Sequence, residues 1–153
     1  MQTSEPIIKI SVRDQRLDLL FGETVLSSYP ISTSRFGLGS KEGSMKTPLG
    51  KFRIGEKIGD GLPINTIFRS RIPLAPEDAP PAGDDLVLSR ILWLDGLEEQ
   101  NANTRERFIY IHGTNHEEEI GRPASHGCIR MKNADLVALY DQIPLGAEVL
   151  IES

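Results

Sequence analysis

Apolar and polar residues alternate at the start of the chain. From Ile8 to Arg13 an apolar residue occupies every second position, which is typical of a half-buried β-strand. Turn-forming dipeptides separate this stretch from two further strand-like segments, so strands are predicted over residues 7–13, 16–21 and 24–31. The chain is therefore expected to open with a three-stranded meander.

Strand patterns recur along the rest of the chain, and one helix interrupts them. The later strands are predicted over residues 51–58, 65–72, 86–94, 107–111 and 147–151. The helix starts near Asn133, a good N-cap residue, keeps apolar residues at helical spacing for about three turns, and stops at Pro144. We find no repeat, linker or second domain. Residues 1–153 are thus predicted to form one mostly β domain of mixed or antiparallel sheets with one main helix.

Two long segments between these elements have the composition of loops. Residues 32–50 are rich in Gly, Ser and Lys, and their glycine spacing fits neither the dinucleotide fingerprint nor the Walker A motif. Residues 59–85 carry several prolines, which interrupt helices and are kept off central strands. A long loop in a compact domain is either functional or disordered. We interpret the second segment as a wall or lid over a groove, with a merely exposed loop as the alternative.

Length and charge exclude several classes of protein. A chain of 153 residues suits one domain, and its net charge of −5 argues against a general binder of nucleic acid or anionic membranes. The single cysteine cannot form an internal disulfide, and no apolar segment reaches the length of a membrane span. The first residues lack the basic and apolar regions of a signal peptide. We therefore expect a cytoplasmic protein, or a periplasmic one if a leader has been removed.

All three histidines and the only cysteine lie within residues 112–131. An ionised thiol is a strong nucleophile, and imidazole is suited to removing its proton near neutral pH. Cys128 follows a polar Ser-His-Gly triplet, whereas a lone cysteine is most often a small buried apolar residue. Gly127 permits positive φ and close approach, so N–H groups of this turn could face an oxyanion. Arg130 could favour the thiolate or hold a substrate carboxylate.

These residues resemble the L,D-transpeptidase (YkuD) family. The resemblance rests on two blocks in the order that the family has, Thr47-Pro48-Leu49-Gly50-Lys51-Phe52 and His112-Gly113 with Ser125-His126-Gly127-Cys128-Ile129-Arg130-Met131. It covers nearly the whole chain, from residue 7 to residue 151. It implies a β-sandwich-like fold and a cysteine acyl-enzyme that acts on peptidoglycan stem peptides or muropeptides without a cofactor.

The resemblance also implies roles for the motif residues. Cys128 would be the nucleophile, and His112 the base that activates it and then protonates the leaving D-amino acid. Family members orient this histidine through the residue that follows it; Gly113 has no side chain, so only its carbonyl is available. The other motif residues are expected to shape the site, contact the substrate or stabilise an oxyanion: Ser125, His126, Gly127 and Arg130. His116 has no counterpart in the motif and is expected on the surface.

A metal site and a non-catalytic module are the alternatives to thiol catalysis. Three histidines and a cysteine are potential zinc ligands, and His112 and His116 are four residues apart. The residues between them are poor helix formers, however, and no Cys-x-x-Cys pair is present. A zinc-dependent hydrolase or metal-binding protein is therefore the main alternative. A wall-binding module is a third interpretation, although it would not require the His/Cys constellation.

Within the family the acyl acceptor is either water or an amine. Water gives an L,D-carboxypeptidase that trims D-Ala from tetrapeptide stems, whereas an amine gives cross-linked or exchanged products. A cytoplasmic enzyme would meet soluble muropeptides, so water is the acceptor that we expect.

Overall fold

The strands form a single sheet in the computed structural model, which describes residues 5–41, 43–81 and 83–153. The elements are β1 (Pro6–Ser11), β2 (Arg16–Phe21), β3 (Thr24–Ser32), β4 (Gly50–Ile58), β5 (Ile67–Arg69), β6 (Ile72–Pro73), β7 (Val87–Gly96), β8 (Tyr110–Gly113), β9 (Ile129–Met131), α1 (Asn133–Gln142) and β10 (Glu148–Glu152). Short 3₁₀ helices lie at Pro76–Asp78, Glu99–Asn101 and Glu117–Glu119. None of the described helices is long and apolar enough to cross a membrane.

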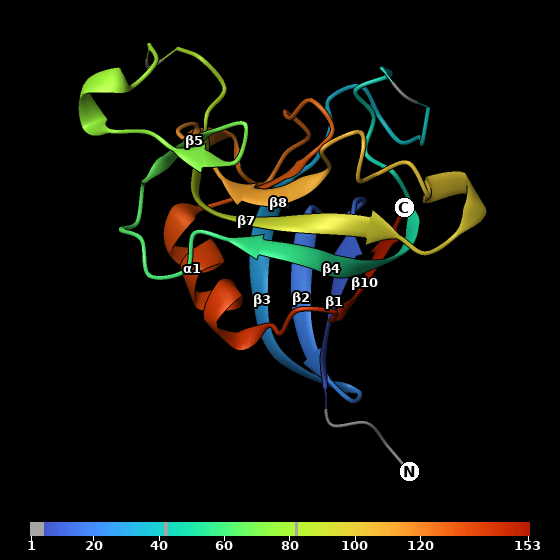
Figure 1. Ribbon diagram of the computed structural model, residues 1–153. Coiled ribbons are helices and arrows are strands. Elements are labelled where there is room, and N and C mark those ends of the chain that lie inside the picture. Colours follow the sequence, from blue (N-terminus) through green and yellow to red (C-terminus); the bar gives the residue numbers. More distant parts are fainter. Residues whose placement is uncertain (1–4, 42, 82) are drawn as a thin grey trace.

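The sheet closes on itself. Its strand order is β4-β10-β1-β2-β3-β9-β8-β7-β5-β6, and an additional pairing of β4 with β7 joins the first eight strands in a ring. Strands β4, β7 and β8 cross in front of β1, β2 and β3 (Figure 1). The prediction of a mostly β fold with one main helix is confirmed, but the fold is a closed, barrel-like sheet instead of a sandwich. The sheet closes because β10 pairs with β1 on one side and with β4 on the other, so hydrogen bonding continues from one layer of strands to the next.

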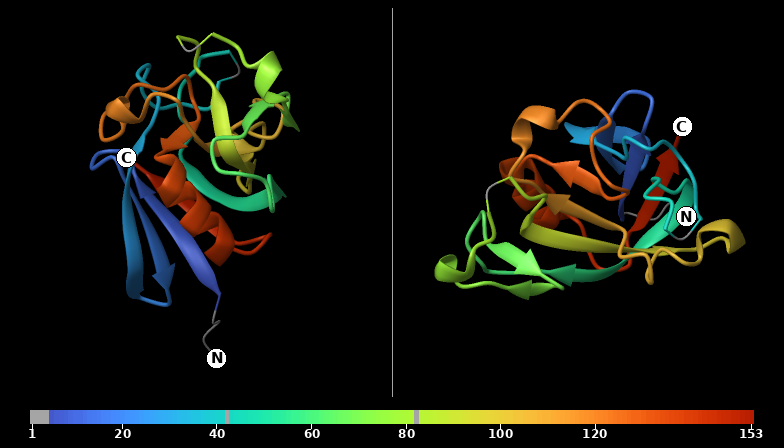
Figure 2. Two further views of the ribbon diagram at one scale, coloured as in Figure 1. Left: turned by 90° about the vertical axis from the view of Figure 1, so that its left-hand side faces the viewer. Right: turned by 90° about the horizontal axis from the view of Figure 1, so that it is seen from above.

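The hydrophobic core lies inside this ring. Alternate residues of β1 and β2 point inward, so Ile8, Ile10, Leu17 and Leu19 are fully buried. Helix α1 packs against β7 and β8 beside the crossing layers (Figure 2). Its buried Leu136 and Leu139 join the same core cluster.

Several predicted elements need correction. The opening meander is confirmed, whereas the strand predicted over residues 65–72 is a hairpin, because Ser70 and Arg71 turn the chain with φ of 49° and 67°. Residues 107–109 precede β8 instead of belonging to it, and Phe108 has a φ of 57°. Strand β9 was not predicted, because it has only three residues and all of them are buried.

The start of α1 is capped from outside the helix. Lys132 is the N-cap residue and Asn133 is already helical, so the predicted cap is wrong by one position. The Glu117 carboxylate accepts a hydrogen bond from the Asn133 backbone N–H at 2.7 Å. The Asn133 side chain is thereby free to donate to the Thr114 carbonyl and to accept from the Ser89 hydroxyl.

Candidate active site

Two adjacent parallel strands bring the motif residues together. In the β8–β9 pair, His112 is the register partner of Arg130 and Ile111 the partner of Ile129. Both isoleucines point into the core, so the alternate positions of these strands face the outside of the ring. Cys128, directly before β9, packs outside the ring in a second cluster that contains Tyr110. Since neighbouring strands are about 4.8 Å apart, His112 and Cys128 lie on one face of adjoining strands.

The thiol of Cys128 is half-buried and held by two backbone groups. Its Sγ accepts a hydrogen bond from the Tyr110 N–H at 3.3 Å and donates to the Phe108 carbonyl at 3.2 Å. Burial raises the pKa of Cys128 to about 11, more than the Tyr110 N–H and the charges of Arg130 and Arg107 can offset. The thiol is therefore protonated at neutral pH, and Arg130 does not generate a resting thiolate.

His112 is buried with one tautomer fixed. Its Nδ1 lies 2.6 Å from the Gly113 carbonyl oxygen. A carbonyl only accepts hydrogen bonds, so Nδ1 carries the proton and Nε2 keeps a free lone pair. Burial lowers the pKa of His112 below its usual 6.5, which keeps the ring neutral. Glycine is required at position 113 because a Cβ there would collide with the Asn133 amide oxygen and the Leu88 carbonyl.

The turn before Cys128 is fixed by buried hydroxyl groups. Ser125 Oγ donates to the Cys128 carbonyl at 2.6 Å and accepts from the Gly127 N–H at 3.3 Å. Thr47, from the upstream motif block, donates its hydroxyl to the Gly127 carbonyl at 3.0 Å. Gly127 has a φ of 124°, a conformation that favours glycine. Ser125 therefore shapes the turn, and the Gly127 N–H is already engaged by a protein group.

Arg130 belongs to a buried ion-pair network. Its side chain is 2% exposed, with Nη2 2.8 Å from Asp85 and Nη1 2.9 Å from Glu119. Both arms of the guanidinium fork are thus filled by the protein, and a substrate carboxylate would have to displace one of these partners. We conclude that Arg130 holds the framework of the site instead of an open substrate contact.

Asp85 is a site residue that the sequence did not reveal. Its carboxylate joins Arg130 to the exposed His126, whose Nδ1 lies 3.2 Å away. Burial alone would raise the pKa of Asp85, but the Arg130 charge and hydrogen bonds outweigh it, and the pKa is lowered. Asp85 ends the irregular proline-bearing segment and belongs to no motif. The only available signal was an acidic residue just before a strongly apolar strand.

The segment 59–85 forms one wall of the site. Phe68 of β5 packs with Cys128 in the outer cluster, and Arg71 at the turn between β5 and β6 donates to the Tyr110 hydroxyl at 3.0 Å. Trp93 is buried in the same cluster and makes an edge-on contact with Tyr110, as a core residue would. Two hollows are lined by residues of this region, although Cys128 lines neither: one of about 140 Å³ beside His126, and one of about 240 Å³ between Phe68 and Asp85.

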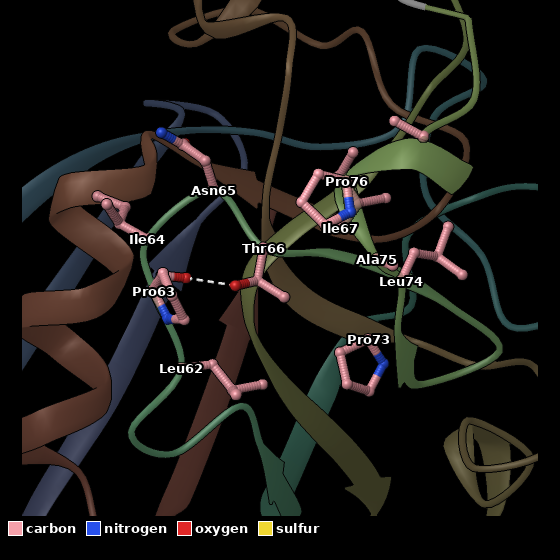
Figure 3. A pocket seen from close by; sticks show the side chains of 11 residues that line it. Leu62, Pro63, Ile64, Asn65, Thr66, Ile67, Pro73, Leu74, Ala75 and Pro76 are labelled. Atoms are coloured by element: carbon pink, nitrogen blue, oxygen red, sulfur yellow. Dashed lines mark hydrogen bonds between the residues drawn. The ribbon is translucent and has the colours of Figure 1, made fainter.

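A further hollow lies in the same segment but apart from the chemistry. It has a volume of about 520 Å³ and is lined mostly by apolar residues on both sides of the β5–β6 hairpin (Figure 3). None of the motif residues contributes to it. We therefore place the candidate active site at Cys128 and not in this hollow.

The histidines do not converge on a common point. His112 contacts the Gly113 carbonyl and His126 contacts Asp85, while His116 lies 3.1 Å from the Asp84 carbonyl. His116 is half-buried and helps to hold the wall, so its expected surface position is only partly correct. Among the described residues, no three His, Cys, Asp or Glu side chains group as metal ligands would. The geometry therefore gives the zinc alternative no support.

Comparison with known proteins identifies relatives of the chain. Residues 5–151 match the family described as L,D-transpeptidase catalytic domain. A protein of Bacillus subtilis named as a putative L,D-transpeptidase YkuD is 30% identical over 94% of this chain and 64% of its own length. The putative L,D-transpeptidase YqjB of the same organism is 52% identical over 31% of this chain and 27% of its own length. The chain thus spans less than two thirds of these relatives.

Solved structures share the fold at low sequence identity. An L,D-transpeptidase from Mycobacterium smegmatis aligns with a TM-score of 0.65 at 16% identity, covering 97% of this chain and 59% of that one. The corresponding values for the L,D-transpeptidase of Xylanimonas cellulosilytica are 0.64 and 20%, with 99% and 62% coverage. Both likenesses concern the fold alone.

Proposed function

The chain belongs to the L,D-transpeptidase catalytic domain family, and from that premise we propose that it is a cysteine acyltransferase whose donors are peptidoglycan stem peptides. The observation that carries the proposal is the position of Cys128 and His112 on one face of adjoining strands, with Nδ1–H of His112 held by the Gly113 carbonyl. The free Nε2 is the atom that can take the thiol proton.

The proposed reaction has two steps. As Sγ of Cys128 attacks the carbonyl carbon before the terminal D-alanine, Nε2 of His112 takes the thiol proton. The carbon–nitrogen bond then breaks, and the same proton passes to the leaving amine, which leaves a thioester on Cys128. Water or an amine then attacks the thioester carbon while Nε2 of His112 takes its proton, the carbon–sulfur bond breaks, and that proton passes to Sγ and restores the thiol. Neutral starting groups suit this sequence because no charge is buried before the peptide arrives.

A tetrapeptide muropeptide tests the nucleophile. The wild type should release D-alanine and show a mass increase equal to the tripeptide acyl group on Cys128. Cys128→Ser should lose turnover by at least about a hundredfold, because an alcohol ionises far less readily than a thiol. Unaltered turnover in that variant would exclude the acyl-enzyme.

A chelator tests the alternative of a zinc-dependent hydrolase. EDTA should leave the rate unchanged, whereas iodoacetamide should abolish it by alkylating Cys128. Chelator-sensitive turnover with stoichiometric zinc would favour a hydrolytic metal site.

A further inference from the structure

Arg71 is an arginine beside residues that hold the thiol, and among the described residues no carboxylate forms an ion pair with it. Arg130 and Arg105 are each bound by two carboxylates, and Arg107 donates to two backbone carbonyls. For Arg71, in contrast, no salt bridge occurs within the described residues, and the hydrogen bond seen there is the one to the Tyr110 hydroxyl. A guanidinium has five N–H donors, so most of this fork is left for a ligand.

The position of Arg71 is set by the residues that hold the thiol. Its guanidinium lies 4.9 Å from the ring centre of Trp93 and 5.0 Å from that of Phe108. Phe108 supplies the carbonyl, and Tyr110 the N–H, that hydrogen-bond to Sγ of Cys128. Arg71 therefore contacts, through their side chains, the two residues whose backbone groups contact the nucleophile.

The local backbone supports a fixed position for this cation. Arg71 lies at the turn between β5 and β6 with a φ of 67°, and its guanidinium contacts Trp93 and Tyr110 of the outer cluster. Two aromatic faces and a hydroxyl restrict the guanidinium plane. A half-buried planar cation without a counter-charge is suited to a carboxylate, which it can bind with two parallel hydrogen bonds.

We propose that Arg71 binds the terminal carboxylate of the residue that leaves the donor peptide. This proposal rests on the proposed function, because it assumes that the scissile bond lies at Sγ of Cys128. The leaving residue carries its carboxylate one carbon away from the scissile nitrogen. A fork beside the thiol would therefore select peptides that end immediately after the cleaved bond.

Two tetrapeptides that differ only at the C-terminus test the contact, one ending in a carboxylate and the other in a carboxamide. The wild type should favour the acid over the amide by roughly 10- to 100-fold in kcat/KM, the range of a hydrogen bond to a charged group. Arg71→Met should lose most of this preference by a fall on the acid alone. Arg71→Lys keeps the charge without the fork and should give an intermediate ratio.

Arg13→Met is the control, because Arg13 is an exposed arginine between β1 and β2 and lines neither hollow of the site region. It should keep the wild-type preference. Equal losses on both peptides in Arg71→Met would show that Arg71 only supports the hairpin, and unchanged rates on both peptides would show that Arg71 makes no contact; either result overturns the proposal while the acyl-enzyme stands. Failure of the wild type to cleave both peptides would instead overturn the proposed function, and this inference with it.

Discussion

At the scale of single residues, the proposed catalytic pair consists of two neutral groups. Burial keeps the Cys128 thiol protonated and the His112 ring uncharged, so neither ion is present before the substrate binds. A resting thiolate–imidazolium pair would need charge stabilisation, and the two nearest backbone contacts supply one N–H and one carbonyl. Activation therefore coincides with attack on the peptide.

The pH dependence of turnover should report these neutral groups. His112 loses its function as a base only when it is protonated, so kcat/KM should stay flat on acidification through 6.5 and fall only below it. Cys128 ionises near 11, so the plateau should extend well into alkaline pH. Steady-state rates measured across this pH range test both the acidic and the alkaline end of the plateau. An acid limb at or above 6.5 would contradict the lowered pKa of His112.

Replacing Arg130 should affect stability more than chemistry. Lysine cannot bridge Asp85 and Glu119 together, so Arg130→Lys should lower the free energy of unfolding. Removing one partner of a buried pair costs about 3 kcal/mol or more; here we expect roughly 1–3 kcal/mol, because lysine keeps the charge and both carboxylates keep access to water. Urea denaturation measures the change, with Arg122→Lys on the exposed part of the same loop as control. Unchanged stability with a lower kcat/KM would favour the substrate contact expected from the sequence.

At the scale of elements, α1 ends on a side chain from the sheet. Nζ of Lys57 donates to the carbonyls of Tyr140 and Ile143 at 2.8 and 2.7 Å, and it lies 4.2 Å from the Tyr140 ring centre. A cation at this end interacts favourably with the helix dipole and satisfies carbonyls that lack partners within the helix. Lys57 of β4 thus joins the helix that covers the core to the closing pair of strands.

Removing this contact should loosen the helix end. Lys57→Met keeps the aliphatic stem and loses the donor, so we expect the free energy of unfolding to fall by about 1 kcal/mol. Burial disfavours the charged ammonium group and lowers the pKa of Lys57. The variant removes this unfavourable burial, which limits the loss of stability. Thermal unfolding measures it. Lys51→Met, on an exposed position of β4, should change little.

Elements with a simple period could be predicted from the sequence, and elements that depend on distant contacts could not. The meander follows from alternation at Ile8 to Arg13. Strand β9 was not predicted because it contains Arg130, a charged residue. Its burial depends on an ion pair with Asp85, which is distant in the sequence. The motif supplied Cys128 and His112, whereas Asp85 became visible only once folding had placed it beside Arg130.

At the scale of the whole molecule, closure of the sheet separates core from chemistry. The inside of the ring is apolar, and Cys128, His112 and Arg130 lie on its outside, between the 59–85 wall and the loop that carries His126. Under the proposed function, the peptide would therefore approach from outside, with no need to enter the ring. This arrangement is compatible with either water or an amine as the acyl acceptor.

We predict that water is the principal acceptor. Tetrapeptide alone should give tripeptide and free D-alanine, and an added amine should divert little of the thioester, because water is present at far higher concentration. Mass spectrometry of the products with and without a D-amino acid measures the partition. Dominant exchange or dimer formation would assign the chain to transpeptidation, with the roles of Cys128 and His112 unchanged.

Ring closure also bears on self-association. An open sheet exposes unpaired backbone groups along both edges, where another chain can add a strand and start aggregation. Here β4 and β7 pair with each other, so in the described part of the chain the strand order ends only at β6. That strand has two residues, and Pro73 has no backbone N–H that could hydrogen-bond to an added strand. The topology that encloses the core thus leaves other copies of the chain little free edge, mainly the part of β3 before Ile31, which among the described residues pairs with β2 alone.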